Sequence, residues 1–498
     1  MRRALPPRAA DVSTPARRVE AGPPADVAGH RVGLVSLGCA KNHVDSEVML
    51  GVLDGQGFEL VADLDRADTV IVNTCGFIDE AREESIDAIL DAAARKADGA
   101  GPVRQVLVAG CMANRYGREL ATEIPEIDGF VDLDSLRQVG ALVQLGGAPA
   151  PEPAASHLVF DHRDSRLLTT GGYAYLKVAE GCNNPCTFCA IPVWRGRLRS
   201  RPVESLVLEA RDLVERGARE LVLVAQDTTR YGEDLGHGRH GLLRLVEALL
   251  EETDADWIRF LYAYPTTLDE SLLQLMASEP RVASYLDMPL QHSDRDVLRA
   301  MRRGGSADRY RRIFERAREL DPEMSLRTTF IVGFPGEDEA AFERLLGFVS
   351  EVRFDHLGAF VYSPENDTPS ASLPDQVPRR IAEERRARLL ELQREIALER
   401  RGRLVGRTLP MLIEGSCEET EHLLQARHQG LAPEVDGRVL INDVAGDGPG
   451  TPGLAGFTAG RIVDVEITDA FADDSVGRIV GFDAAASTAG SAAAEAGS

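Results

Sequence analysis

Residues 181–192 read GCNNPCTFCAIP and place three cysteines, Cys182, Cys186 and Cys189, in a C-x3-C-x2-C spacing. They closely follow the apolar run YAYLKVA, residues 173–179, which predicts a β-strand. Three thiolates on one short loop can hold a 4Fe-4S cluster and leave its fourth iron open to a substrate or cofactor. Zinc is the alternative, but structural zinc takes four ligands, usually from spaced cysteine pairs. The spacing therefore favours an iron–sulfur cluster with one open iron.

Upstream, residues 30–146 alternate short apolar runs with longer amphipathic segments, which predicts a parallel α/β sheet domain. The runs RVGLVSLG, TVIVNT and VRQVLVAG predict strands, and each ends at a cysteine: Cys39, Cys75 and Cys111, spaced 36 residues apart. Because the carboxyl ends of parallel strands share one edge of a sheet, these thiols can converge into a second three-cysteine site. A lone buried cysteine more often serves as a small hydrophobic residue, but three at equivalent positions favour a site.

Small and polar residues surround this second triplet. Glycines flank its members at Gly38, Gly76 and Gly110, which predicts tight turns. Lys41 and Asn42 are further polar residues of the first loop, while Asp45 and Ser46 are predicted to cap the helix that follows.

A Pro- and Ala-rich linker is predicted over residues 147–167, and a second α/β series over residues 168–400. Its candidate strands are residues 173–179, 221–225, 257–263, 284–290, 325–333 and 356–362. Six strands with helical connections predict a partial β/α barrel whose active face lies at the carboxyl ends of the strands. The C-x3-C-x2-C triplet follows the first strand and therefore lies on that face.

The rest of the chain is simpler. Mixed charges over residues 378–403 predict a solvated connecting helix, and short β runs with Gly-rich turns over residues 401–483 predict a small β-barrel. Cys417 belongs to neither triplet, so we expect it to be a bystander. Residues 1–29 and 484–498 have the composition of a disordered leader and tail.

Length and composition set the class of protein. A chain of 498 residues is long enough for about three domains. Seven cysteines, an odd and sparse number, argue against a disulfide framework and favour a reducing, cytoplasmic location. No apolar run is long enough to span a bilayer, so no membrane partner is expected. The net charge of −24 favours a basic protein partner over a phosphate backbone, although charge also serves solubility.

The C-x3-C-x2-C triplet resembles the signature of radical S-adenosylmethionine (SAM) enzymes, in which the open iron chelates the amino and carboxylate groups of SAM. Phe188 stands at the aromatic position of that signature. With both triplets, the chain resembles the methylthiotransferase family over residues 31–483. The strings that carry the resemblance are SLGCAKNHVDSE, NTCGFIDEA, EGCNNPCTFCAIP, VAQDTTRYG, MPLQH and RTTFIVGFPGE. It implies an N-terminal cluster domain, a radical SAM core and a C-terminal TRAM domain.

Within the family, NTCGFI, QDT, PLQH and LPDQVP resemble the branch that modifies ribosomal protein S-twelve. The resemblance implies a SAM-dependent transferase that adds a methylthio group to the β-carbon of an aspartate. It implies two 4Fe-4S clusters, an auxiliary cluster on Cys39, Cys75 and Cys111 and a SAM-binding cluster on the other triplet. SAM would serve as radical source and methyl donor, with a sulfur donor and an electron donor as partners.

The resemblance also suggests residues around SAM. Gly333, Gly336 and Glu337 belong to IVGFPGE, residues 331–337, which resembles the family segment near the SAM adenine. A strand-ending turn explains the same glycines and proline equally well. Other polar residues that can line the pocket are Gln226, Asp227, Thr228 and His292. Arg195 can pair with a carboxylate of the substrate or of the protein, and the bulky Trp194 is expected to alter packing near the SAM cluster.

Two kinds of rival remain. From Gly402 to Asp483 the chain has 6 Arg and no Lys against 14 Asp plus Glu, a net charge of −8. An acidic domain suits a basic ribosomal protein better than tRNA, so a tRNA adenosine methylthiotransferase is the alternative rather than the expectation. A non-catalytic metal-binding protein that binds RNA is more remote. An electron-transfer protein would give every iron a thiolate, whereas both triplets lack a fourth.

Overall fold

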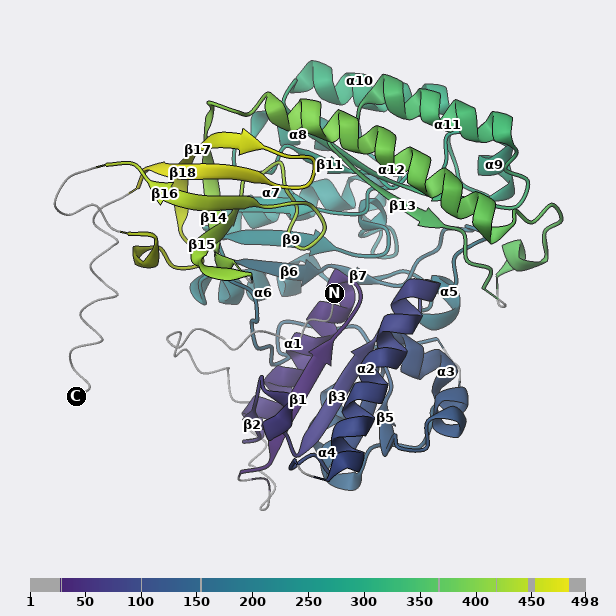
Figure 1. Ribbon diagram of the computed structural model, residues 1–498, viewed down its shortest axis with the longest axis vertical. Coiled ribbons are helices and arrows are strands. Elements are labelled where there is room, and N and C mark those ends of the chain that lie inside the picture. The colour runs from purple at the N-terminus through teal and green to yellow at the C-terminus, as the bar shows by residue number, and fades with distance from the viewer. Residues whose placement is uncertain are drawn as a thin grey trace.

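The computed structural model describes residue 27 and residues 29–99, 101–152, 155–365, 368–417, 419–446 and 453–482. The predicted disordered tail, and all of the predicted leader except residues 27 and 29, lie outside this part of the chain. Figure 1 shows an N-terminal sheet domain, a central β/α unit beside it and a small β-barrel next to the central unit. The predicted α/β fold class with a terminal small barrel is confirmed.

The N-terminal domain is a parallel five-stranded sheet in the order β2-β1-β3-β4-β5. Its elements are β1 (Arg31–Ser36), α1 (Ala40–Gly55), β2 (Glu59–Leu60), β3 (Thr69–Thr74), α2 (Asp79–Asp98), β4 (Gln105–Ala109), α3 (Gly110–Glu123), β5 (Gly129–Val131) and α4 (Val139–Leu145). Helices α1 and α4 share a core with one face of the sheet, and α2 and α3 with the other. Strands β3 and β4 are buried throughout, which explains their unbroken apolar sequence.

The central unit contains two parallel three-stranded sheets, β6-β9-β10 and β11-β12-β13. Its elements are β6 (Tyr173–Lys177), β7 (Ala179–Glu180), α5 (Ile191–Trp194), β8 (Arg199–Ser200), α6 (Val203–Glu215), β9 (Glu220–Val224), α7 (Gly241–Glu252), β10 (Trp257–Phe260), α8 (Glu270–Ser278), β11 (Tyr285–Asp287), α9 (Arg295–Ala300), α10 (Ala307–Leu320), β12 (Ser325–Val332), α11 (Glu339–Val352), β13 (His356–Val361) and α12 (Arg379–Gly402). Hydrogen bonds of 2.9 Å from the Ala283 amide to the Ile258 carbonyl and from the Ala263 amide to the Asp287 carbonyl join the two sheets. The six predicted strands therefore form one partial barrel.

Helix α12 differs from the solvated connector that its charges predict. It buries Leu389 and Ile396 in the core that the barrel strands share with the surrounding helices, and the Gln393 amide donates to the Phe354 carbonyl at 3.0 Å. One face of the helix is thus packed, and the many charges that dominate the sequence occupy the remaining surface.

Strands of the C-terminal domain close into a barrel in the order β14-β15-β16-β18-β17. They are β14 (Thr408–Cys417), β15 (Thr420–Arg427), β16 (Val439–Val444), β17 (Ile462–Ala470) and β18 (Ser475–Gly481). Short 3₁₀ helices complete the described chain: η1 (Leu64–Arg66), η2 (Leu136–Gln138), η3 (Thr228–Arg230), η4 (Gly238–His240), η5 (Pro369–Ser372) and η6 (Leu454–Gly456). None of the described helices has the length and apolar character needed to cross a bilayer.

Buried ion pairs join the C-terminal barrel to the central unit. The Glu220 carboxylate accepts from Arg259 Nε at 2.7 Å and from the Arg427 guanidinium at 2.8 Å. Glu220 and Arg259 are fully buried, and Arg427 is 1% exposed. Burial by itself would raise the pKa of Glu220, but the two arginines outweigh it and lower that pKa.

We expect Glu220→Ala to destabilise the protein by about 3–5 kcal/mol, because it leaves buried guanidinium groups without their counter-charge. Denaturant unfolding would measure the loss. Glu252→Gln is the matched control, since the Glu252–Arg211 pair is 46% exposed on both sides and should change stability by no more than about 1 kcal/mol. Equal effects of the two substitutions would contradict the prediction.

Glu47 of α1 ties the N-terminal domain to the segment that precedes β6. Its carboxylate accepts from Arg166 Nε at 2.7 Å and from the Thr169 amide at 2.9 Å. Burial raises the pKa of Glu47, but Arg166 and His43 more than offset it and lower the value to about 2.

This pKa predicts an acid-sensitive contact. A carboxyl with a lowered pKa stabilises the fold above its ordinary value of 4.5, and that stability is lost as the pH falls toward 2. We expect Glu47→Gln to remove up to about 3 kcal/mol at pH 6, with the difference from wild type shrinking between pH 4.5 and pH 2. Urea unfolding of both proteins across that range tests it, and a difference that does not change with pH would contradict it.

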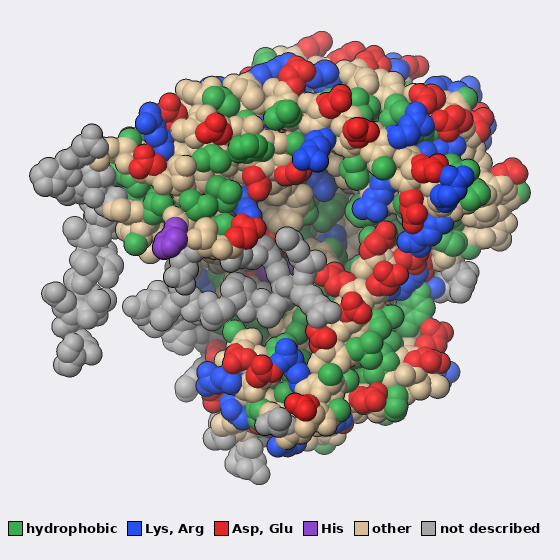
Figure 2. Space-filling view, in the orientation of Figure 1, with side chains coloured by type: hydrophobic (Ala, Val, Ile, Leu, Met, Phe, Trp, Pro, Cys, Tyr) green, Lys and Arg blue, Asp and Glu red, His purple; other side chains and the backbone are tan. Residues whose placement is uncertain are grey.

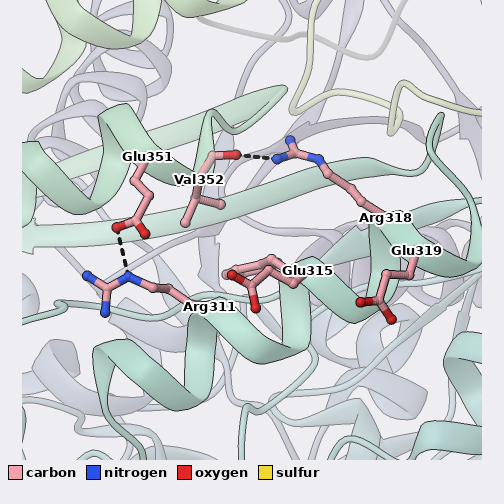
Figure 3. Close-up of a pocket in the computed structure, with 7 residues that line it drawn as sticks. Arg311, Glu315, Arg318, Glu319, Glu351 and Val352 are labelled. Carbon is pink, nitrogen blue, oxygen red and sulfur yellow. Dashed lines mark hydrogen bonds and ion pairs between the residues drawn. The ribbon is translucent and has the colours of Figure 1, made fainter.

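A surface hollow of about 400 Å³ lies between α10 and the end of α11, as Figure 3 shows. Arg311 Nε donates to Glu351 at 2.7 Å across it, and the Arg318 guanidinium donates to the Val352 carbonyl. Because the end of α11 leads into the start of β13, the hollow lies at the amino-terminal face of the barrel, where structural rather than catalytic groups are usual.

Candidate active site

The N-terminal cysteines lie at the carboxyl ends of three neighbouring strands. Cys39 immediately precedes α1 in the loop after β1, Cys75 directly follows β3, and Cys111 is the second residue of α3 after β4. Because β1, β3 and β4 are adjacent and parallel, the three loops share one edge of the sheet, as the sequence predicts.

Asn42 connects all three loops. Its Nδ2 donates to the Leu37 carbonyl at 3.2 Å and to the Thr74 carbonyl at 2.8 Å, while its Oδ1 lies 3.6 Å from Cys111 Sγ. The side chain is fully buried. Leu37 precedes Cys39 and Thr74 precedes Cys75, so one amide holds the three cysteine loops together.

The three thiols influence one another electrically. Burial would raise the pKa of Cys39, but Lys41 and Arg195 outweigh it and lower that pKa. Burial, followed by the neighbouring Cys39 and Cys111, raises the pKa of Cys75 to about 12. Such a group of mutually repelling thiolates is stable only with a cation between them or with protons on most of its sulfurs.

The second triplet occupies a loop that follows β7. Cys182 Sγ accepts from the Asn184 amide at 3.4 Å, and the Cys189 amide donates to the Cys186 carbonyl at 3.3 Å. Burial raises the pKa of Cys182 to about 11 and that of Cys189 to about 12, with the neighbouring Cys186 contributing to both. All seven cysteines are free.

Side chains from later loops of the central unit contact this loop. Asn184 Nδ2 donates to Asp227 at 2.6 Å, and Asp227, which lies between β9 and η3, is 2% exposed. Arg303 donates to Cys186 Sγ at 3.7 Å and stacks over Tyr264, 4.0 Å from its ring centroid. Asp227 is thus a loop-positioning group, whereas Arg303 and Tyr264 were not singled out from the sequence.

The segment with Gly333, Gly336 and Glu337 forms a turn after β12. Both glycines have positive φ, +76° and +84°, and a Cβ on Gly333 would meet Ala382 at 2.3 Å. The Glu337 carboxylate accepts from the Gly333 amide at 2.8 Å and from Arg385 at 3.0 Å, and lies 3.5 Å from His292 Nε2. Glu337 therefore stabilises the turn through the Gly333 amide and Arg385.

Arg195 follows the second triplet and reaches the first. Its guanidinium is 2.6 Å from Asn42 Oδ1 and 3.0 Å from both Asp45 and Glu180, and two of its nitrogens lie 3.2 and 3.3 Å from Cys111 Sγ. The sequence left open whether Arg195 pairs with a carboxylate of the substrate or of the protein. In the structure it pairs with two carboxylates of the protein, Asp45 and Glu180. Arg195 thus connects the segment after the second triplet to Cys111 of the first through one buried network. Figure 2 shows a recess between the lower and upper parts of the molecule, which in Figure 1 are the N-terminal domain and the central unit.

The predicted helix caps are wrong. Helix α1 begins at Ala40, so Asp45 and Ser46 lie inside it rather than at its start. Asp45 pairs with Lys177 and Arg195, and Ser46 Oγ donates to Ser36 Oγ at 2.7 Å. Since the chain turns into the helix directly at Cys39, the later polar residues face a buried interface instead of the amides that a cap would satisfy.

Two charged residues of this network were missed. Lys177 ends β6 and Glu180 ends β7, and the lysine pairs with Glu180 at 3.0 Å and with Asp45. Gln226, predicted to line the pocket, donates to Glu180 at 2.7 Å. The sequence did contain a signal for this network, namely a lysine at the end of an otherwise apolar strand. A lysine is rarely buried without a partner, so this position indicates a nearby carboxylate.

Trp194 packs beside both triplets. Its ring forms a small cluster with Cys111 and Ala190 and contacts Phe77 edge-on at 6.5 Å. Ala190 is the neighbour of Cys189, so the tryptophan fills the space between the two triplets.

The donor sets fit 4Fe-4S clusters better than zinc. Three thiolates of a cluster each bind a different iron, so they do not converge on one point as zinc ligands do. Both sites supply three thiols, and both contain a nearby guanidinium that can donate to sulfur.

Family models match three parts of the chain. They are an uncharacterized protein family, UPF0004, over residues 31–132, the radical SAM superfamily over residues 176–349 and the TRAM domain over residues 405–480. With the partial barrel and its cysteine triplet, these matches define a radical SAM enzyme.

The relatives are more specific. The chain is 44% identical to the ribosomal protein uS12 methylthiotransferase RimO of Solibacter usitatus, covering 90% of this chain and 95% of that protein. It is 46% identical to the RimO of Anaeromyxobacter sp. strain K, with 91% and 94% covered. The chain belongs to the RimO family of methylthiotransferases, which confirms the resemblance seen in its motifs.

A solved structure supports the fold. The radical SAM methyltransferase TsrM from Kitasatospora setae, determined with cobalamin and a [4Fe-4S] cluster, matches with a TM-score of 0.50 at 14% identity. The match covers 69% of this chain and 77% of TsrM. At this identity the likeness concerns the arrangement of the chain alone.

Proposed function

We propose that this enzyme attaches a methylthio group to the β-carbon of an aspartate in ribosomal protein uS12. The observation that carries the proposal is the pair of three-thiol sites, connected through Arg195 and the carboxylates that it binds, in a chain whose relatives are named for that modification. A site for SAM and a separate site for sulfur are the two requirements of a methylthiolation.

We assign the SAM-binding cluster to Cys182, Cys186 and Cys189, and the auxiliary cluster to Cys39, Cys75 and Cys111. When bound, the clusters supply an electron for reductive cleavage of SAM to a hydrogen-abstracting radical and an open iron for sulfur, while a second SAM supplies the methyl group. The corresponding regions would be a cluster domain over residues 30–146, a radical SAM core over 168–400 and a TRAM domain over 401–483.

The chain's own residues orient these groups and keep water from them. Asn184 and Asp227 fix the loop of the SAM triplet, and Asn42 fixes the three loops of the auxiliary triplet. Trp194, 2% exposed, fills the space between the triplets. Excluding solvent and other C–H bonds from the site prevents side reactions of a radical before it reaches the substrate.

Charge supports a basic protein substrate. The net charge of −24 for the chain, and of −8 for residues 402–483, would attract a ribosomal protein and repel the backbone of tRNA. A ribosomal protein substrate would place the enzyme in the cytoplasm. A sulfur donor and an electron donor complete the expected partners.

The test is an anaerobic assay with reconstituted enzyme, SAM, dithionite and sulfide, offered either uS12 or hypomodified tRNA. We expect mass spectrometry to find one methylthio group on an aspartate of uS12, with release of 5′-deoxyadenosine. Modification of tRNA alone would establish the alternative branch. Neither product, from enzyme that holds both clusters, would refute the proposal and its alternative together.

A further inference from the structure

Arg195 is the charged side chain of the segment after the SAM triplet that contacts the other cysteine site. It is 3% exposed, and its Nε and Nη2 lie 3.3 and 3.2 Å from Cys111 Sγ. Cys111 is also the cysteine whose Sγ lies 3.6 Å from Asn42, the amide that joins the three loops. A guanidinium in this place donates hydrogen bonds to a sulfur that we assign to the auxiliary cluster.

The orientation of this guanidinium is fixed from the opposite side. Glu180 and Asp45 each accept from it at 3.0 Å, and Lys177 pairs with the same two carboxylates. The two positive charges of Arg195 and Lys177 are balanced by the two carboxylates, so the position of the guanidinium is set by the protein. The planar fork of arginine, held by two carboxylates, directs its remaining donors at the sulfur.

We propose that Arg195 is a positioning residue that raises the reduction potential of the auxiliary cluster through its hydrogen bonds to Cys111. The inference rests on the proposed assignment of that cluster. An N–H···S bond and a buried positive charge both stabilise the extra electron of a reduced cluster, and hydrogen bonds to cluster sulfurs are among the factors that set its potential.

Two substitutions separate the parts of this role. Arg195→Gln removes the charge and the fork, whereas Arg195→Lys keeps the charge but provides a single ammonium that cannot bind Asp45, Glu180 and Cys111 in the same plane. The matched control is Arg201→Gln, since Arg201 is as buried, at 2% exposed, but bonds to Glu209 and to the Lys177 carbonyl instead of a cysteine.

The experiment uses full-length protein in which Cys182, Cys186 and Cys189 are replaced by alanine, so that only the auxiliary cluster is present. Its potential is measured by anaerobic titration with dithionite, one electron per cluster, followed by electron paramagnetic resonance. We expect Arg195→Gln to lower the ratio of reduced to oxidised cluster at a given potential at least tenfold, a shift of about 59 mV, with a smaller shift for Arg195→Lys. Arg201→Gln should leave the potential unchanged.

Each outcome decides. An unchanged potential in Arg195→Gln, with normal iron content, overturns the inference. If Arg195→Gln does not fold or does not hold the cluster, Arg195→Lys takes its place, and a wild-type potential there overturns the inference. Absence of any cluster when Arg195 is intact and the SAM triplet is replaced would instead refute the assignment of the auxiliary site, and with it the proposed function.

Discussion

Replacing Cys186 by alanine should abolish release of 5′-deoxyadenosine and methylthiolation together, whereas replacing Cys111 should abolish methylthiolation and leave 5′-deoxyadenosine release measurable. The first substitution removes a ligand of the site assigned to SAM, and the second a ligand of the site assigned to sulfur. Each variant should also lose the iron of one cluster, about four atoms per chain. Parallel assays of iron, 5′-deoxyadenosine and modified uS12 measure all three quantities.

Cys417 offers the matched control for this experiment. It is buried in β14 of the C-terminal barrel, where its Sγ donates to Glu419 at 3.0 Å, and it belongs to neither triplet. Cys417→Ala should therefore keep full iron content and activity. Equal loss of 5′-deoxyadenosine in Cys111→Ala and Cys186→Ala would show that the sites do not have separate roles.

The arrangement of the cysteines could be predicted because it depends on topology. Parallel strands place their carboxyl ends at one edge, so spacing and strand order suffice to bring Cys39, Cys75 and Cys111 together. The six strands of the barrel were visible for a similar reason, since each is a short apolar run between turn signals. These features are local in the sequence, or follow from rules that hold for all parallel sheets.

The contacts between the domains could not be predicted in this way. Asp45 has the residue type and spacing of a helix cap, and only the position of β6 and α5 turns it into a partner of Lys177 and Arg195. Leu389 and Ile396 were hidden in the same manner among the charges of α12. A single sequence contains the residues of such contacts but not the docking of one unit against another, which depends on packing across long separations.

The second large effect is expected from a substitution at Gly110, because the auxiliary site depends on a backbone conformation that only glycine permits. Gly110 directly precedes Cys111 with a φ of +89°. A Cβ at this position would lie 2.4 Å from the Thr74 carbonyl oxygen and 2.8 Å from the Thr74 amide nitrogen. Since both are backbone atoms next to Cys75, they cannot move aside without displacing that cysteine as well.

We therefore expect Gly110→Ala to prevent assembly of the auxiliary cluster, with loss of about four irons per chain and no detectable methylthiolation, while 5′-deoxyadenosine is still released. Gly57→Ala is the matched control: Gly57 has nearly the same φ, +88°, but nothing lies within 4 Å of its added Cβ. The control bears the backbone strain without the clash. Because the two glycines share that strain, full activity of Gly110→Ala, or an equal loss in both variants, would show that close contact between the loops of Cys75 and Cys111 is not what forms the site.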